Sequence, residues 1–287
     1  MFVTSSMDKT VALWDTNVMR PLDQYPFKET VTQIHWNTVP SNRPLIAVAN
    51  LTSNIELIDP RAGEAIRNLR WKIESVSAVQ WSVELDYILL TGGRNGNISV
   101  WDIRSGRSHL KLLQDKCRSA HGAAVGGLKF SSDGLFVVSM SIDRVIRIWD
   151  AHNMELLETI RVAILLKKGL IPTPSSNPSI SFDIFSVGNA LYLAIPFDDD
   201  VLIVELNTNF SKEDRMSSNS YKCSRFFLKG HFQYVNASVF RQDVCQVVSS
   251  ANDKTLLLWT SAFDEVLTDE TTATLQKLQE DRWSDDD

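Results

Sequence analysis

The chain has 287 residues, of which 44% are hydrophobic, 22% are charged and three are cysteine. This composition excludes an intrinsically disordered chain and a disulfide-stapled scaffold, and the few cysteines favour a reducing compartment. Residues 264–287 hold nine acidic and two basic side chains, so the net charge of −6 leaves +1 for the rest of the chain. A nearly neutral body argues against direct, sequence-specific binding of nucleic acid, which usually requires a strongly basic surface.

The N-terminal segment MFVTSSMDKT has neither the basic region nor the apolar region of a secretory signal. No 18 apolar residues follow one another anywhere in the chain, so no membrane-spanning helix is predicted. We therefore expect a soluble intracellular protein that has no membrane partner.

A repeat runs along the chain. The segments VALWD, ISVWD, IRIWD and LLLWT each form an alternating pattern that ends in Trp and then, in three cases, Asp. IELID and LIVEL stand at the same phase without the Trp. The six anchor positions, spaced 43 to 55 residues apart, are Trp14, Ile58, Trp101, Trp149, Val204 and Trp259. A period of this length ending in Trp-Asp is typical of a four-stranded propeller blade, so an all-β propeller is predicted.

Polar residues recur at fixed distances before the Trp anchors. Ten residues before each Trp stands a Ser or Thr: Thr4, Thr91, Ser139 and Ser249. Six residues before it stands an Asp or Asn: Asp8, Asn95, Asp143 and Asp253. His121 and His231 stand 28 residues before Trp149 and Trp259. A buried His can bridge the hydroxyl and the carboxylate while the indole N–H joins the network, so we expect structural tetrads of His121, Ser139, Asp143 and Trp149 and of His231, Ser249, Asp253 and Trp259.

The anchors also predict the domain organisation. We expect a half blade over residues 1–16, five blades ending near residues 59, 102, 150, 205 and 260, and an acidic, disordered tail over 263–287. The blades anchored at Ile58 and Val204 lack the polar network and must rely on apolar packing. Residues 171–179 and 207–220 interrupt the period and are predicted loops, which are either partner contacts or tolerated insertions. The tail is either a docking peptide or a solvated segment.

Motifs for catalysis are absent from the sequence. It contains no phosphate-binding P-loop, no nucleophile elbow and no metalloprotease helix, and its cysteines are too far apart for a zinc site. The sequence therefore predicts a protein that is not an enzyme and that needs no cofactor and no metal.

The repeats resemble those of WD-repeat propellers over residues 1 to about 262. MFVTSSMDKTVALWDTN, LDYILLTGGRNGNISVWDIRSG, AHGAAVGGLKFSSDGL and the ending EDRWSDDD are similar to the Cockayne syndrome group A family of WD-repeat proteins. The resemblance implies a seven-bladed propeller that acts as the substrate receptor of a cullin-4 ubiquitin ligase. Its implied partners are the adaptor damaged-DNA-binding protein 1, stalled RNA polymerase II and repair factors. The implied process is transcription-coupled nucleotide excision repair in the nucleus.

The same resemblance implies an adaptor contact. Receptors of this class tend to carry Trp-Asp-x-Arg at the end of a blade strand, and Trp101-Asp102-Ile103-Arg104 matches this motif in full. Ile58-Asp59-Pro60-Arg61 matches it without the Trp. We therefore expect Asp102, Arg104, Asp59 and Arg61 to meet the adaptor, with each Arg held at the rim for a bidentate contact. The alternative is an internal Asp–Arg pair that ends the strand.

The family's full chain has two more repeats and an N-terminal helical segment, so the resemblance implies that this sequence, with about five and a half blades, is N-terminally truncated. Two other functions stay open. One is a WD-repeat interaction scaffold unrelated to ubiquitin, and the other is a propeller enzyme with convergent acidic groups in its central channel.

Overall fold

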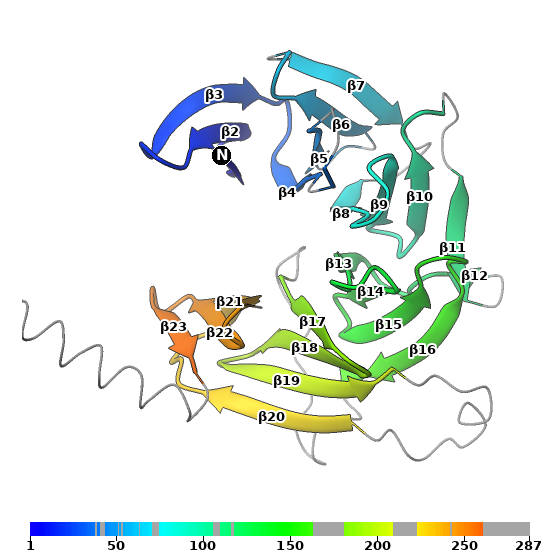
Figure 1. Cartoon of the computed structure of the whole chain (residues 1–287), viewed down its shortest axis with the longest axis vertical. Helices are drawn as coiled ribbons and strands as arrows, with labels where there is room; N and C mark the ends of the chain where they lie inside the picture. Colours follow the sequence, from blue (N-terminus) through cyan, green and yellow to red (C-terminus); the bar gives the residue numbers. More distant parts are fainter. Residues whose placement is uncertain are drawn as a thin grey trace, which may run out of the picture.

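A computed structural model of the chain describes residues 1–37, 39–40, 44–50, 52, 54–62, 64–70, 75–105, 110–115, 118–162, 181–208, 223–241 and 243–260. Within these residues the chain forms six antiparallel sheets that follow one another around an incomplete ring (Figure 1). The predicted all-β fold is confirmed as a partial propeller. The predicted loop over 171–179, most of the one over 207–220, and the acidic tail over 263–287 lie outside the described residues.

The first three sheets hold the strands up to Ser119. The first sheet contains β1 (Phe2–Ser5), β2 (Thr10–Asp15) and β3 (Arg20–Pro26). The second contains β4 (Val31–Trp36), β5 (Ile46–Asn50), β6 (Asn54–Asp59) and β7 (Glu64–Arg70). The third contains β8 (Val76–Trp81), β9 (Ile88–Gly93), β10 (Ile98–Asp102), β11 (Lys111–Asp115) and the short β12 (Arg118–Ser119).

The remaining three sheets continue around the ring. The fourth contains β13 (Val125–Phe130), β14 (Phe136–Ser141), β15 (Val145–Asp150) and β16 (Leu156–Arg161). The fifth contains β17 (Asp183–Val187), β18 (Ala190–Phe197), β19 (Asp200–Asn207) and β20 (Cys223–Lys229). The sixth contains β21 (Val235–Arg241), β22 (Gln246–Ala251) and β23 (Leu256–Trp259). No helix in the described part of the chain is long and apolar enough to cross a membrane.

The sheets are offset by one strand from the repeat read in the sequence. In each four-stranded sheet the anchor lies on the third strand, and a fourth strand follows it: β7 follows Ile58, and β16 follows Trp149. The first sheet accordingly includes β3 beyond the half blade expected over residues 1–16, because residues 20–26 pair with β2. Each chain segment from one anchor to the next therefore contributes strands to two sheets.

The hydrophobic core lies between neighbouring sheets. One cluster joins β2, β3, β5 and β6, and another joins β14–β16 to β17–β19. The anchors Ile58 and Val204 are both fully buried in these clusters. Neither anchor has an indole to donate a hydrogen bond, so apolar contact replaces that bond, and each buried side chain of this size contributes roughly 1.5–3 kcal/mol.

The first strand of four of the sheets contains a β-bulge. The register of β4, β8, β13 and β21 shifts near the start of each strand, at Val31/Gln33, Val76/Ala78, Val125/Gly127 and Val235/Ala237. At two of these bulges a hydroxyl reaches the next sheet. Thr32 Oγ1 donates to the Val76 carbonyl (3.3 Å) and Ser77 Oγ donates to the Val125 carbonyl (2.6 Å). The extra residue of a bulge is left out of the backbone pairing within its sheet, and here its hydroxyl forms a hydrogen bond with the backbone of the next sheet.

Candidate interaction sites

One hydrogen bond recurs in all four sheets that have a Trp anchor. The indole N–H of the Trp donates to the Ser or Thr hydroxyl ten residues before it, on the neighbouring strand. The distances are 2.8 Å for Trp14–Thr4, 2.8 Å for Trp101–Thr91, 2.9 Å for Trp149–Ser139 and 2.8 Å for Trp259–Ser249. The bond gives each large ring a fixed orientation while satisfying its one polar atom, both where the ring is buried (Trp101 and Trp149) and where it is partly exposed (Trp14 and Trp259).

The sixth sheet brings all four residues of its expected tetrad together. His231 Nε2 lies 2.8 Å from Ser249 Oγ, and His231 Nδ1 lies 3.0 Å from Asp253 Oδ2. Hydrogen bonds lower the pKa of Asp253, above all the one from the Thr255 hydroxyl. The backbone N–H groups of Phe232 and Thr255 and the contact with His231 act in the same direction. The His231 side chain is fully buried, so the network acts as a structural support for the loop that enters this sheet.

The fourth sheet departs from this pattern. His121 Nε2 contacts Ser139 Oγ at 2.7 Å, as expected, but Nδ1 is buried and has no partner among the described residues. The predicted bridge from His121 to Asp143 is therefore not formed. Burial, and secondarily the nearby Arg147, lowers the pKa of His121 to about 3, so this imidazole is neutral.

Two positions beside the tetrads differ between these sheets: Ser141 and Val145 of the fourth sheet correspond to Ala251 and Thr255 of the sixth. In the fourth sheet the Ser141 hydroxyl donates to Asp143 Oδ1, which also accepts the Val145 N–H. In the sixth sheet the position of Ser141 is taken by Ala251, which has no hydroxyl, and the carboxylate of Asp253 is shared between Thr255 and His231. We therefore expect the Ser141 hydroxyl to hold the Asp143 carboxylate away from His121, whereas the Thr255 hydroxyl of the sixth sheet contacts both Asp253 and His231 Nδ1.

An Asp follows four of the six anchors, and in each case it closes a turn. Its carboxylate accepts the backbone N–H two residues later at Asp15–Asn17 (2.8 Å), Asp59–Arg61 (2.9 Å), Asp102–Arg104 (2.9 Å) and Asp150–His152 (2.8 Å). This is the geometry of an Asx turn, which Asp adopts readily. Asp102 and Asp59, both expected at an adaptor contact, therefore also have a structural role at the end of β10 and β6.

Arg104 has a fixed and exposed side chain. Its Nε and Nη2 donate to the two carboxylate oxygens of Asp102 at 3.0 and 2.8 Å, and its guanidinium lies 3.3 Å from the centre of the Tyr87 ring. The hydrogen bonds from Arg104 lower the pKa of Asp102. The side chain of Arg104 is nevertheless 62% exposed. The internal Asp–Arg pair is thus present, and it orients a guanidinium whose outer edge faces solvent.

Arg61 occupies the equivalent position in the second sheet and is exposed. Since β6 and β10 are the third strands of adjacent sheets and end in the same direction, Arg61 and Arg104 lie on one face of the ring. We call this the motif face. Whether a partner binds it stays a prediction.

A polar cluster among the innermost strands has no counterpart in the predicted sites. The backbone N–H of Trp81 donates to Nδ1 of the His35 ring (3.2 Å), so the neutral ring carries its proton on Nε2. This Nε2 lies 2.9 Å from the side-chain amide nitrogen of Gln80. Rotating that amide by 180° pairs its buried oxygen with this N–H. Burial lowers the pKa of His35 to about 4. The cluster borders a cavity of about 340 Å³ that Lys129 also lines.

His35 and its partners lie 45 and 46 residues apart in the sequence, which is one repeat. The repeat period was the one feature of the sequence from which the contact of His35 with its partners could have been predicted. Among the described residues no group of three or more His, Cys, Asp or Glu side chains is placed to hold a metal.

Three segments of the chain match the family model described as "WD domain, G-beta repeat": residues 64–102, 114–150 and 221–260. The matches end at or next to the anchors Trp101, Trp149 and Trp259. These three segments are WD40 repeats. WD40 domains are typically non-catalytic scaffolds for protein–protein interaction.

Relatives from two protein groups resemble the chain along most of its length. "WD repeat-containing protein ATCSA-1" of Arabidopsis thaliana is 23% identical over 361 aligned positions, which cover 99% of this chain and 74% of the relative. "Eukaryotic translation initiation factor 3 subunit I" of Drosophila grimshawi is 25% identical over 261 positions, which cover 88% of this chain and 74% of the relative. The protein of that name from Drosophila virilis is 24% identical over the same share of this chain.

Proposed function

We propose that this WD40 chain is the substrate-recognition subunit of a cullin-4 E3 ubiquitin ligase, attached through the adaptor damaged-DNA-binding protein 1. In this role it acts in transcription-coupled nucleotide excision repair in the nucleus and performs no chemistry itself. Stalled RNA polymerase II and its repair factors are the proposed targets of recognition.

The observation that carries the proposal is similarity along nearly the whole of this chain combined with one matching motif. The resemblance to ATCSA-1 covers 99% of the chain, and Trp101-Asp102-Ile103-Arg104 matches the motif of the receptor class. The guanidinium of Arg104 is held by Asp102 and Tyr87 and remains 62% exposed. A pre-oriented Arg at a protein rim loses little entropy when it meets a carboxylate or carbonyl, so it suits a contact with an adaptor.

Co-purification with the adaptor tests the proposal. The tagged chain is expected to retain the adaptor, and Arg104→Glu is expected to reduce the retained amount at least tenfold. Arg225→Glu is the matched control, because Arg225 is an exposed Arg on the outer strand β20 of another sheet. Failure of the wild-type chain to retain the adaptor would contradict the receptor role.

The second candidate is a WD-repeat scaffold unrelated to ubiquitin. The specific observation in its favour is the similarity to subunit I of translation initiation factor 3. The same co-purification separates the two candidates, since a scaffold of this kind retains initiation-factor subunits and not the ligase adaptor.

A further inference from the structure

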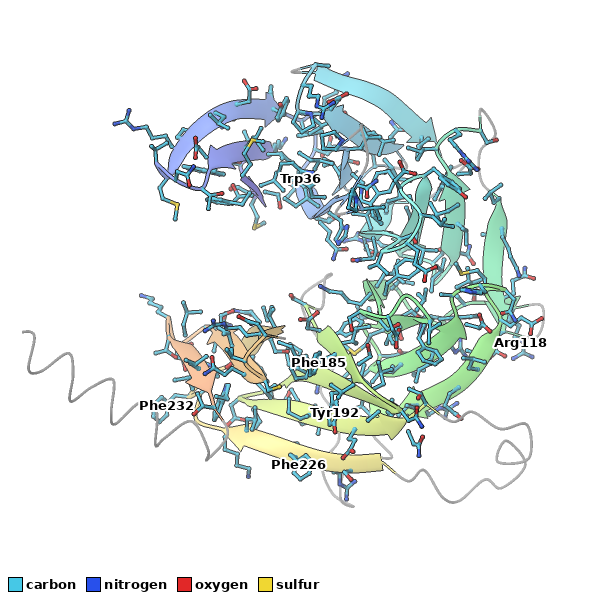
Figure 2. The ribbon with its side chains drawn as sticks, viewed as in Figure 1. Trp36, Arg118, Phe185, Tyr192, Phe226 and Phe232 are labelled. Atoms are coloured by element: carbon cyan, nitrogen blue, oxygen red, sulfur yellow. The ribbon has the colours of Figure 1, made fainter. Side chains whose placement is uncertain are left out.

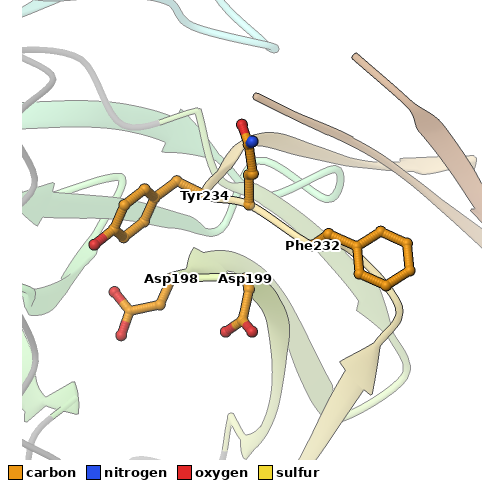
Figure 3. Close-up of a pocket in the computed structure, with 5 residues that line it drawn as sticks. Asp198, Asp199, Phe232 and Tyr234 are labelled. Atoms are coloured by element: carbon orange, nitrogen blue, oxygen red, sulfur yellow. The ribbon is translucent and has the colours of Figure 1, made fainter. Parts of the chain in front are cut away.

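A pocket on the face opposite the motif face combines exposed aromatic rings with a carboxylate. It has a volume of about 480 Å³ and is lined by Asp198 and Asp199, from the turn between β18 and β19, and by residues 232–234, which lead into β21 (Figure 3). The turn lies at the start of β19, and the motif face lies at the end of third strands. Eight residues of β-strand span roughly 25 Å, so the two sites are separated by the height of a sheet.

The aromatic rings of the pocket are open to solvent. Phe232 is 90% exposed and Tyr234 is 60% exposed. Figure 2 shows Phe232 at the edge of the molecule, separate from Phe226 on the outer strand β20. Exposed rings that border a pocket are characteristic of binding sites, because their apolar area is removed from water only when a partner arrives.

The carboxylate of Asp199 is available to a ligand. Asp199 is exposed, and within the described residues its carboxylate receives no hydrogen bond and forms no ion pair. Burial above all, and then the negative charge of Asp199, raises the pKa of the neighbouring Asp200, while Lys229 lowers it. Because Asp198 is already paired with Arg144, Asp199 is the carboxylate of this turn that a cation entering the pocket would meet.

The chain itself shows which cation fits such surroundings. Nη2 of Arg144 lies 3.0 Å from Asp198 Oδ1, and its guanidinium lies 4.4 Å from the centre of the Phe197 ring. Arg104 is held in the same way between Asp102 and Tyr87. Both sites place a planar guanidinium against a ring face and a carboxylate, a combination that favours Arg over Lys. Asp199 offers the carboxylate and Phe232 and Tyr234 offer the rings of a third such site.

The walls of the pocket are already fixed. The Val235 N–H donates to the Asp198 carbonyl (2.7 Å), and the Phe232 N–H donates to Asp253 Oδ2 (3.0 Å). The Asn252 N–H donates to the Tyr234 carbonyl (2.9 Å). These bonds join the segment that carries the rings to the turn of the fifth sheet and to the tetrad of the sixth. A preformed site of this kind binds without a large ordering cost.

We propose that this pocket binds an arginine side chain of an extended segment of a partner protein. The site is independent of the proposed adaptor contact, which lies on the opposite face, so either proposal can fail while the other stands. In a ligase receptor it would leave the motif face free for the adaptor while the opposite face holds a target.

The test uses the full chain labelled with ¹⁵N-phenylalanine and ¹⁵N-tyrosine and the peptide Ala-Gly-Ala-Gly-Arg-Gly-Ala-Gly-Ala. Addition of the peptide is expected to shift the amide resonances of Phe232 and Tyr234, with a dissociation constant of about 1 mM or tighter. The same peptide with citrulline, the neutral isostere of Arg, is expected to bind at least about tenfold more weakly. Equal binding of the two peptides, or shifts that avoid these two residues, would overturn the proposal.

Two pairs of variants locate the contact. Asp199→Asn is expected to weaken binding about tenfold and Phe232→Ala about threefold. Asp243→Asn removes an exposed carboxylate near the other end of β21, and Phe226→Ala removes an exposed ring from β20; both controls are expected to bind as the wild type does. Unchanged binding by Asp199→Asn would refute the site, and the citrulline comparison on the wild-type chain keeps the test decisive if a variant folds poorly.

Discussion

The Ser141 hydroxyl donates a hydrogen bond to the Asp143 carboxylate, and that carboxylate is the group that would otherwise reach Nδ1 of His121. The fourth and sixth sheets carry the same four tetrad residues, yet only the sixth has a complete network. The difference accompanies two changes beside the tetrad, Ser141 in place of Ala251 and Val145 in place of Thr255, and the first of them leads to a direct test.

Ser141→Ala is expected to stabilise the fourth sheet. Without the competing hydroxyl, Asp143 is free to turn toward His121 and satisfy its buried nitrogen, for a gain of about 0.5–1.5 kcal/mol in the free energy of unfolding. Urea unfolding measures the change. The reciprocal variant Ala251→Ser in the sixth sheet is expected to lower stability by a similar amount, and a loss of stability in Ser141→Ala would contradict the competition.

Ser249→Ala is expected to cost about 2 kcal/mol of folding free energy. The Ser249 hydroxyl contacts both the Trp259 indole and His231, so its removal leaves two polar groups unsatisfied. Ser250→Ala changes the next residue of β22, which points to the other side of the sheet, and is expected to cost less than about 0.5 kcal/mol. Equal effects of the two changes in thermal or urea unfolding would show that the network contributes nothing.

Gly96→Ala is expected to be among the most damaging single changes. Gly96 has φ of +83°, and a Cβ there would lie 2.1 Å from the His121 carbonyl oxygen, while the Gly96 carbonyl accepts the His121 N–H at 2.8 Å. Strain and the broken contact between the third and fourth sheets predict a loss of more than about 3 kcal/mol. Gly188→Ala is the control: its φ is also positive, at +55°, but its Cβ would meet open space, so about 1 kcal/mol is expected.

Stability is expected to fall as the pH is lowered from about 6.5 to about 4. Burial lowers the pKa of His121 to about 3 and that of His35 to about 4, from an ordinary value of 6.5. In this range the unfolded chain binds protons that the folded chain does not, so each histidine removes roughly 1.4 kcal/mol of the free energy of unfolding per pH unit of acidification.

Urea unfolding at several pH values measures this slope. His35→Gln is expected to reduce the slope between pH 6.5 and 4, and His152→Gln, which removes an exposed histidine, is expected to leave it unchanged. A slope that is identical in the wild-type chain and in His35→Gln would exclude the contribution of His35.

Regular spacing made much of the fold predictable from the sequence. A Trp and a hydroxyl ten residues apart are enough to place two paired strands, and the structure contains that pair at Trp14, Trp101, Trp149 and Trp259. Even the anchors Ile58 and Val204 could be located, because the period fixes their position and burial requires an apolar residue there.

Contacts that depend on side chains outside the repeating columns could not be predicted. The missing His121–Asp143 bond accompanies Ser141, whose hydroxyl donates to the Asp143 carboxylate, and Val145, which lacks the hydroxyl of Thr255. The pocket at Asp199 and Phe232 joins a hairpin turn to a loop of the next sheet, and neither position belongs to a column of the repeat. Spacing along the chain carries no information on either arrangement.

The one-strand offset between repeat and sheet has a consequence for how such a chain can gain or lose repeats. Removing residues 60–102, from one anchor to the next, would take β7 from the second sheet and β8–β10 from the third, yet β11 could still pair with β6 as its outer strand. The sequence repeat that genetic duplication would copy is therefore shifted by one strand from the sheet that backbone hydrogen bonds hold together. Every junction between two copies of the repeat therefore lies within one sheet, where backbone hydrogen bonds join the last strand of one copy to the first strand of the next.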